Sequence, residues 1–109
     1  MESIKLFAKM KTTCNWDYLY RQLAEECCEL AQASMKYIRA KNDETPISVE
    51  EARAEYIEEM ADVLVMLDIA AVELNAYEDE KICETIDYKR ERLDKRLEEK
   101  RKRMEEKRE

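Results

Sequence analysis

The feature that most constrains the fold of this chain is the complete absence of glycine among its 109 residues. Tight hairpin turns need residues with positive φ, which glycine supplies most readily, so an antiparallel sheet is strongly disfavoured. Residues that favour helices, among them Glu, Lys, Arg, Ala and Leu, are abundant instead. We therefore predict an all-α fold, a helical bundle in one domain over residues 1–109. A chain of this length builds a modest core, and its helices often complete their burial against another subunit.

The hydrophobic pattern predicts three main helices. The first runs from Trp16 to Ala40, after a short amphipathic segment from Ile4 to Met10. A break follows around Pro46, because proline disfavours helical backbone in the residue before it. The second helix is expected from Val49 to about Asn75.

Local signals add detail to the second and third helices. Ser48, followed three residues later by Glu51, has the spacing of a capping box. Residues 60–74 are apolar almost all round, which predicts burial on more than one side. The third helix should begin near Glu78 and end in a charged helical tail at about 98–109, expected to be solvated or fraying. Its apolar stripe consists of Ile82, Ile86, Leu93 and Leu97. We expect no internal repeat.

Acidic residues fall inside the apolar stripes of the first two helices when these are wound at about 100° per residue. Glu26 lies within the first stripe and Glu29 at its edge, while Glu59 lies within the second and Asp62 flanks it. The stripes consist of Leu19, Leu23, Leu30 and Tyr37 in the first helix and of Ala52, Tyr56, Val63, Met66 and Ala70 in the second. Both helices therefore place acids where a core is expected.

A buried carboxylate is costly unless it is paired, hydrogen-bonded or bound to a cation. Four acids that converge cannot neutralise one another, whereas a hard divalent cation such as Mg²⁺ prefers oxygen ligands. The spacing of three residues in each helix places each pair of acids on one face. The alternative is that partly exposed acids pair with Lys or Arg of another helix or subunit.

Basic residues also face inward in the third helix. Lys89 falls inside the apolar stripe, with Arg92 and Arg96 on its flank. Either these cations pair with the acids, or they hold the phosphates of a substrate.

Charge and cysteine usage limit the compartment and the partners. The net charge is −7; residues 1–88 hold 20 acidic and 9 basic side chains, and residues 89–109 hold 7 and 11. Nucleic acid is therefore not an expected partner. The N-terminus is too polar for a secretory signal, and no apolar run reaches the roughly 18 residues of a membrane span, so we expect a cytoplasmic protein. The four cysteines lack CxxC spacing and histidine is absent, which argues for buried reduced thiols rather than a zinc site.

The order of the acidic residues resembles that of a known enzyme family. The segment EECCE at 25–29, followed after a helix break by EMAD at 59–62, resembles the MazG-like nucleotide pyrophosphohydrolases. Their signature is Glu-Glu-x-x-Glu followed later by Glu-x-x-Asp. The basic segment KRERLDKR at 89–96 looks like the basic stretch after the acidic motifs in many members. The resemblance covers most of residues 16–97.

The resemblance implies Mg²⁺-dependent hydrolysis of a nucleoside triphosphate between its α and β phosphates, giving the monophosphate and pyrophosphate. It implies an ion, Mg²⁺ or alternatively Mn²⁺, held by four acids: Glu26, Glu29, Glu59 and Asp62. Glu25 and Glu26 are assigned a catalytic role, with Glu25 orienting or deprotonating the attacking water.

The same resemblance suggests how the substrate is bound. Lys89, Arg92 and Arg96 would bind the triphosphate, and Trp16 is available to stack on the base, although a tryptophan at a helix start is often a core or staple residue. A short stand-alone member is expected to be a homo-oligomer, a dimer or a tetramer, whose subunits complete a four-helix core.

Two other functions remain open. One is a non-catalytic oligomeric interaction module whose helix makes coiled-coil contacts from Lys89 onward. The other is a related pyrophosphohydrolase acting on a different phosphorylated metabolite. A di-iron bundle is disfavoured because the chain has no histidine.

Overall fold

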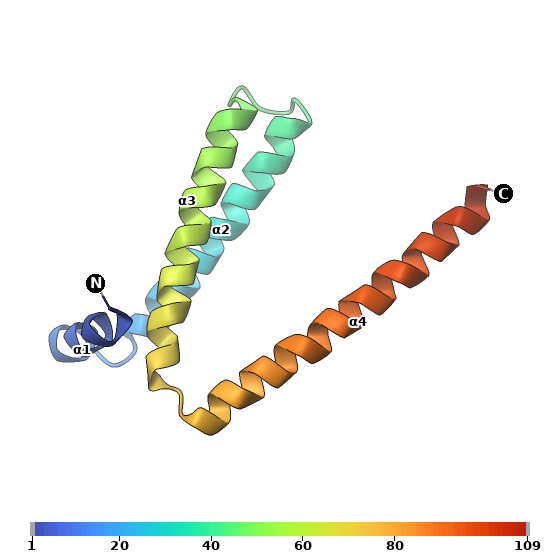
Figure 1. The fold of residues 1–109 in the computed structure, drawn as a ribbon. Helices are drawn as coiled ribbons and strands as arrows, with labels where there is room; N and C mark the ends of the chain where they lie inside the picture. Colours follow the sequence, from blue (N-terminus) through green and yellow to red (C-terminus); the bar gives the residue numbers. More distant parts are fainter. Residues whose placement is uncertain (1, 109) are drawn as a thin grey trace. The chain divides into compact units, whose positions relative to one another are not determined.

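The all-α prediction is confirmed. The computed structural model describes residues 2–108, which form four α-helices and one 3₁₀ turn and contain no strand (Figure 1). By its internal contacts the chain forms two compact units, one ending at Glu73 and the other beginning at Leu74. The first unit holds α1 (Ser3–Thr13), α2 (Tyr18–Lys41), α3 (Val49–Ala70) and the 3₁₀ turn η1 (Ala71–Glu73). The second holds α4 (Ala76–Arg108).

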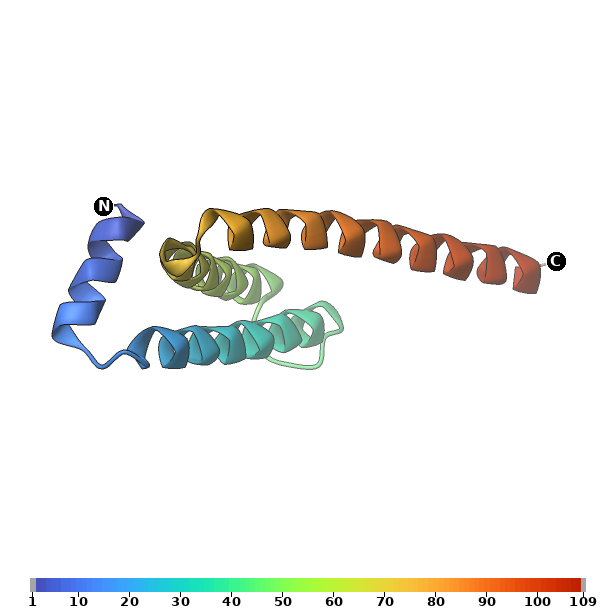
Figure 2. The same cartoon turned by 90° about the horizontal axis from the view of Figure 1, so that it is seen from below.

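Helices α2 and α3 form an antiparallel hairpin, and the two views show them side by side (Figures 1 and 2). The loop between them contains Asp43, which has a φ of 59°. Aspartate tolerates this left-handed conformation better than most residues, so it takes the place that glycine commonly fills after a helix. The predicted start of α3 is confirmed, because the Ser48 hydroxyl accepts a hydrogen bond from the Glu51 backbone N–H at 3.1 Å.

A small apolar core closes the end of the hairpin away from this loop. Leu19 of α2 packs with Met66 and Ile69 of α3, and α1 adds partly buried residues such as Leu6 and Phe7. The Ser3 hydroxyl of α1 also donates a hydrogen bond to the Asp68 carboxylate of α3. At the other end of the hairpin, the rings of Tyr37 and Tyr56 stack with centroids 5.9 Å apart. The hairpin is therefore fixed near both ends, and residues midway along it can face each other at a defined height.

The boundaries of the last two helices differ from the prediction. Helix α3 ends at Ala70 rather than near Asn75, and Asn75 instead caps α4, which begins at Ala76. The Asn75 side chain accepts from the Glu78 N–H at 2.9 Å, and the Glu78 carboxylate accepts from the Asn75 N–H at 3.1 Å. This reciprocal capping box satisfies N–H groups that have no partner inside the helix, so the new helix starts here.

The charged tail is a solvated helix and not a fraying one, so the first of the two expectations for it holds. Helix α4 continues without a break to Arg108, and Arg101 forms ion pairs with Glu98 and Glu105 one turn away on either side. Such pairs, together with residues of high helix propensity and the lack of glycine and proline, support a helix even where apolar residues are few. None of the helices between residues 2 and 108 is both long enough and apolar enough to cross a lipid bilayer.

Candidate metal centre

Four acidic side chains meet between α2 and α3. Glu26 and Glu29 come from α2, and Glu59 and Asp62 come from α3. One carboxylate oxygen from each residue can be chosen so that all four lie within 4.8 Å of one another. The spacing of three residues aims both acids of each helix at the facing helix, and the antiparallel hairpin brings the two pairs to the same height. The structure thus brings together all four residues that were predicted from the sequence as metal ligands.

Two of these acids are partly buried, and each has one carboxylate oxygen without a hydrogen-bond partner. Glu26 and Glu59 are half-buried, and Glu29 is exposed. The Oε2 atoms of Glu26 and Glu59 are shielded from solvent, and neither accepts a hydrogen bond from any residue between 2 and 108. No Lys or Arg within that range forms an ion pair with any of the four acids. Within the described part of the chain, pairing with basic side chains does not explain the cluster.

The electrostatics of the cluster favour protonation when no cation is present. Burial raises the pKa of Glu26 above its ordinary value, and the negative charges of Glu29 and Asp62 raise it further. Burial is also the largest cause of the raised pKa of Glu59, followed by the same two charges. Both acids therefore lie where negative charge is unfavourable and where a cation would be strongly attracted.

The donor set fits a hard divalent cation. All four donors are carboxylate oxygens, the ligand type that Mg²⁺ and Ca²⁺ prefer, and neither nitrogen nor sulfur takes part. Two oxygens on opposite sides of a Mg²⁺ ion are about 4.2 Å apart, given Mg–O distances of about 2.1 Å. The observed limit of 4.8 Å lies close to this value. The side chains would thus need little movement to bind an ion, although these donors do not select among Mg²⁺, Mn²⁺ and Ca²⁺.

A hollow of about 300 Å³ opens beside the cluster. Its lining includes Glu29 and Glu59, together with Lys36 of α2 and Glu55 of α3. The Lys36 Nζ atom lies 3.7 Å from a Glu55 carboxylate oxygen, and both side chains are about half exposed. Lys36 is a positively charged residue near the acids, and it was not predicted from the sequence as a site residue. Its position seven residues after Glu29, on the same face of α2, is the signal that could have found it.

The other predicted site residues lie outside the cluster. Glu25 is exposed on α2, next to Glu26 in sequence, and is not among the converging acids. Lys89, Arg92 and Arg96 are exposed on α4, in the second unit of the chain. The Arg92 guanidinium lies 5.8 Å from the centre of the Tyr88 ring.

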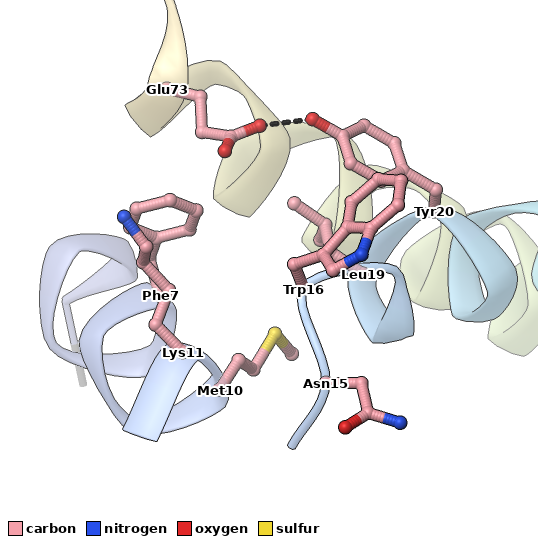
Figure 3. Close-up of a pocket in the computed structure, with 8 residues that line it drawn as sticks. All are labelled: Phe7, Met10, Lys11, Asn15, Trp16, Leu19, Tyr20 and Glu73. Atoms are coloured by element: carbon pink, nitrogen blue, oxygen red, sulfur yellow. Dashed lines mark hydrogen bonds between the residues drawn. The ribbon is translucent and has the colours of Figure 1, made fainter. Parts of the chain in front are cut away.

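Trp16 precedes α2 and is 81% exposed, so it is not a core residue. It lines a cavity of about 110 Å³ in the first unit, together with Phe7, Leu19 and Tyr20 (Figure 3). The rings of Trp16 and Tyr20 pack edge to face with their centroids 6.3 Å apart, and the Tyr20 hydroxyl donates a hydrogen bond to Glu73. The cavity is therefore walled by aromatic rings, one of them held by a carboxylate from η1.

The cysteines differ from their predicted environment. Cys27, Cys28 and Cys83 are exposed and Cys14 is half-buried, and all four are free thiols. The expectation of buried thiols is wrong because Cys27 and Cys28 lie on the solvent side of α2, whose opposite face meets α3.

The architecture and the site together describe an all-α protein with an acidic cluster in a helical hairpin. No known protein family model matches the chain. No curated protein and no solved structure matches it either.

Proposed function

We propose that this chain is a Mg²⁺-dependent nucleoside triphosphate pyrophosphohydrolase, which hydrolyses the bond between the α and β phosphates. The observation that carries the proposal is the convergence of four carboxylates with two shielded oxygens that lack partners. Such a cluster is explained by a cation that these acids bind. The order of the acids along the chain, with its resemblance to the MazG-like enzymes, supports the choice of reaction.

The roles of the acids follow from their positions. Glu26, Glu29, Glu59 and Asp62 would hold Mg²⁺, or Mn²⁺ in its place. When bound, the ion neutralises negative charge on the phosphates and lowers the pKa of a bound water. Glu26 is assigned to catalysis as well as to binding, because it lies inside the cluster. Glu25 is exposed beside it and is proposed to orient or deprotonate the attacking water.

Basic side chains are proposed to bind the triphosphate. Lys89, Arg92 and Arg96 of α4 would contribute positive charge, from the same subunit or from a neighbouring one. Lys36 is an additional candidate, because it lines the hollow beside Glu29 and Glu59. Its weak pairing with Glu55 at 3.7 Å leaves the ammonium group available for a stronger anionic partner.

The aromatic cavity is proposed to bind the base. Trp16 lies just before α2, and Glu26 lies eight residues after the first residue of that helix, which corresponds to about 12 Å along its axis. An extended nucleoside triphosphate has a comparable length, so its base and its phosphates would reach the two places in one molecule. Stacking on an exposed tryptophan would contribute about 1–3 kcal/mol.

Apolar residues of α3 support a homo-oligomer, a dimer or a tetramer. Ile57, Leu64 and Val65 are all more than half exposed. A second subunit packed here would complete a four-helix core. We also propose a cytoplasmic location, where nucleoside triphosphates are abundant.

The decisive experiment measures pyrophosphate release from each ribo- and deoxyribonucleoside triphosphate, with Mg²⁺, with Mn²⁺ and with a chelator. We expect release with at least one substrate, and its loss with the chelator. Glu59→Gln should lower the rate at least about 100-fold, because it removes a ligand charge from the cluster. The matched control is Glu58→Gln, which removes the same charge from an exposed position one residue away and should leave the rate unchanged.

Two results would contradict the proposal in different ways. If no triphosphate is hydrolysed but a nucleotide sugar or another phosphorylated metabolite is, the reaction class stands and the substrate is wrong. If no pyrophosphate bond is cleaved in any compound with any divalent ion, the non-catalytic interaction module becomes the better explanation. That alternative is favoured by one observation, the exposed apolar stripe of α4.

A further inference from the structure

Helix α4 exposes a straight apolar stripe along most of its 33 residues. The stripe consists of Ile82, Ile86, Leu93, Leu97 and Met104, whose exposed fractions lie between 43% and 57%. Wound at about 100° per residue, all five fall within about 60° of one another. Apolar side chains aligned over six turns of an otherwise charged helix indicate a surface that another helix covers.

The stripe arises from a repeat of 11 residues, which corrects our expectation that the chain has no internal repeat. The segments are ICETIDYKRER (82–92), LDKRLEEKRKR (93–103) and the partial MEEKRE (104–109). The first position of each segment is apolar, and the first two segments also share an apolar fifth position and the pattern Lys-Arg-x-Arg at their end. A period of 11 corresponds to about 3.67 residues per turn, close to the pitch of an undistorted helix. The stripe can therefore stay straight against a partner of similar length.

The charges of α4 change sign along its length. Residues 76–88 contain five acidic side chains and one basic side chain, a net charge of −4. Residues 89–109 contain seven acidic and eleven basic side chains, a net charge of +4. A parallel pair of these helices would bring like halves together, whereas an antiparallel pair brings opposite halves together.

We propose that α4 binds, antiparallel, to α4 of a second copy of this chain. In the register whose two-fold axis passes between Lys89 and Arg90, four of the five apolar residues of the stripe match in height between the two copies, and Met104 lies beyond them, level with Asn75 of the other copy. Ile82 of one copy lies level with Leu97 of the other, and Ile86 lies level with Leu93. Four pairs of apolar contacts then form around the axis, two on each side of it.

The flanking charges match in the same register. Five acidic residues of each copy come level with basic residues of the other: Glu78 with Arg101, Asp79 with Lys100, Glu84 with Lys95, Asp87 with Arg92, and Glu98 with Lys81. Glu80 and Glu99 are the one pair of acids in α4 that comes level. Lys89 of both copies lies near the axis, where its long side chain can turn its ammonium group to solvent while its methylenes cover the apolar stripe. A nucleic acid is a poorer partner for this surface, because it would leave the stripe uncovered and would repel the acidic half.

This inference does not rest on the acidic cluster, since none of the four clustered acids belongs to α4. It shares α4 with Lys89, Arg92 and Arg96, the basic residues proposed to bind the triphosphate. It is also distinct from the proposed packing of subunits on α3. A loss of pairing through α4 can therefore be observed in a protein that keeps its metal-dependent stabilisation.

The first experiment measures self-association of the full chain by sedimentation as a function of concentration. Ile86→Glu combined with Leu93→Glu should weaken the association through α4 at least about 100-fold, because each copy then places two charges in the apolar stripe. The control is Tyr88→Glu, which adds a charge on another face of α4 and should have little effect. Added salt should weaken the wild-type association, because attraction between opposite halves is screened.

The second experiment tests the orientation. The four native cysteines are replaced by serine, and single cysteines are introduced as Ile86→Cys and Leu93→Cys in separate chains. Under mild oxidation an equimolar mixture should form a disulfide-linked dimer of the two different chains, while each chain alone forms far less. Efficient crosslinking of each chain with itself would show a parallel pair and overturn the proposal.

Two further outcomes would also overturn the proposal. One is a sedimentation profile that the paired glutamate substitutions leave unchanged. The other is a wild-type chain that stays monomeric and binds a short labelled DNA duplex through α4, which would make nucleic acid the partner of this helix.

Discussion

Glu26 and Glu59 are the residues whose environment departs most from what their chemistry favours. Each is half-buried, each has one shielded oxygen that lacks a partner, and each has other carboxylates as neighbours. In the metal-free protein this arrangement destabilises the folded state. A bound cation would turn the cluster's contribution to stability from unfavourable to favourable. The two residues therefore allow a test of the cluster that does not depend on knowing the substrate.

The first prediction concerns Glu59→Gln and thermal stability. In the presence of a chelator the variant should melt a few degrees higher than the wild type, because one of the repelling charges is gone. Mg²⁺ should raise the melting temperature of the wild type and have little effect on the variant. Circular dichroism at 222 nm (the helical band) follows both melts. A wild-type protein that Mg²⁺ does not stabilise at millimolar concentration would remove the cation from the explanation.

The second prediction concerns pH. Because the pKa values of Glu26 and Glu59 are raised in the folded state, the folded chain binds protons more tightly than the unfolded chain. Their contribution to the free energy of unfolding is fully present below about pH 4.5, the ordinary pKa of these groups, and is lost as the pH rises through their raised pKa values.

The measurement compares melting temperatures across this pH range in chelator, for the wild type and for a variant with both glutamates replaced by glutamine. The difference between the two proteins isolates these groups from the other acids of the chain. The wild type should lose stability relative to the variant as the pH rises. A difference that is constant with pH would contradict the raised pKa values.

At the scale of single residues, the sequence was informative where a charged side chain fell at a position that the helical periodicity assigns to the core. The four clustered acids could be predicted because a carboxylate in an apolar stripe is visible when a helix is wound from sequence. The exposure of Cys27 and Cys28 was missed, because a cysteine is compatible with either face of a helix. Lys36 was missed because a lysine beside acids looks like an ordinary surface residue until the hollow it lines is known.

At the scale of elements, the start of α3 depends on one side chain. The hydrogen bond from the Glu51 N–H to the Ser48 hydroxyl satisfies a backbone donor that has no partner inside the helix. The third prediction is that Ser48→Ala lowers the free energy of unfolding by about 1 kcal/mol. Chemical denaturation followed by circular dichroism measures the change.

Ser34→Ala is the matched control for this substitution. The Ser34 hydroxyl donates to the Leu30 carbonyl inside α2, where alanine is the better helix former, so the loss should be much smaller or reversed. Equal losses at positions 34 and 48 would show that Ser48 stabilises the protein by some means other than capping.

Helix boundaries could be predicted where the sequence contains a clear capping residue. The prediction failed where two sequence signals compete. The apolar pattern of α3 extends to Leu74 in the sequence, yet Asn75 and Glu78 form a capping box that starts a new helix. The sequence left open whether the tail of α4 is a solvated helix or a fraying end, because charge density alone does not decide between the two. The pairing of Arg101 with Glu98 and Glu105 shows how such a segment holds a helix together.

At the scale of the molecule, one apolar residue connects all three helices of the first unit. Ile69 is only 2% exposed and belongs to the core cluster with Leu19 and Met66, against which α1 packs. The fourth prediction is that Ile69→Ala lowers the free energy of unfolding by about 2–4 kcal/mol, because a cavity forms where three helices meet. Ile38→Ala removes the same atoms from a residue that is half exposed, and should cost less than about 1 kcal/mol.

The two variants should be compared by denaturation at one protein concentration, so that any self-association affects both equally. Similar losses for Ile69→Ala and Ile38→Ala would mean that the end of the hairpin near α1 does not form the core.

The all-α class followed from composition alone, because a chain without glycine and with one proline has few alternatives. The division into two units did not, since the break at residues 74–75 carries neither a proline nor a run of small polar residues. Whether subunits complete a four-helix core remains a prediction at this scale.

The thinness of the core has a consequence for the life of the protein in a cell. Between residues 2 and 108 only seven apolar residues are buried, and three of them are alanines. A chain with so few buried apolar residues gains little stability from its core and spends more time in open forms that proteases cleave. Any ligand or partner that binds the folded form reduces that time. Turnover should therefore slow as the chain accumulates or as its ligands become plentiful, so that scarcity itself promotes degradation.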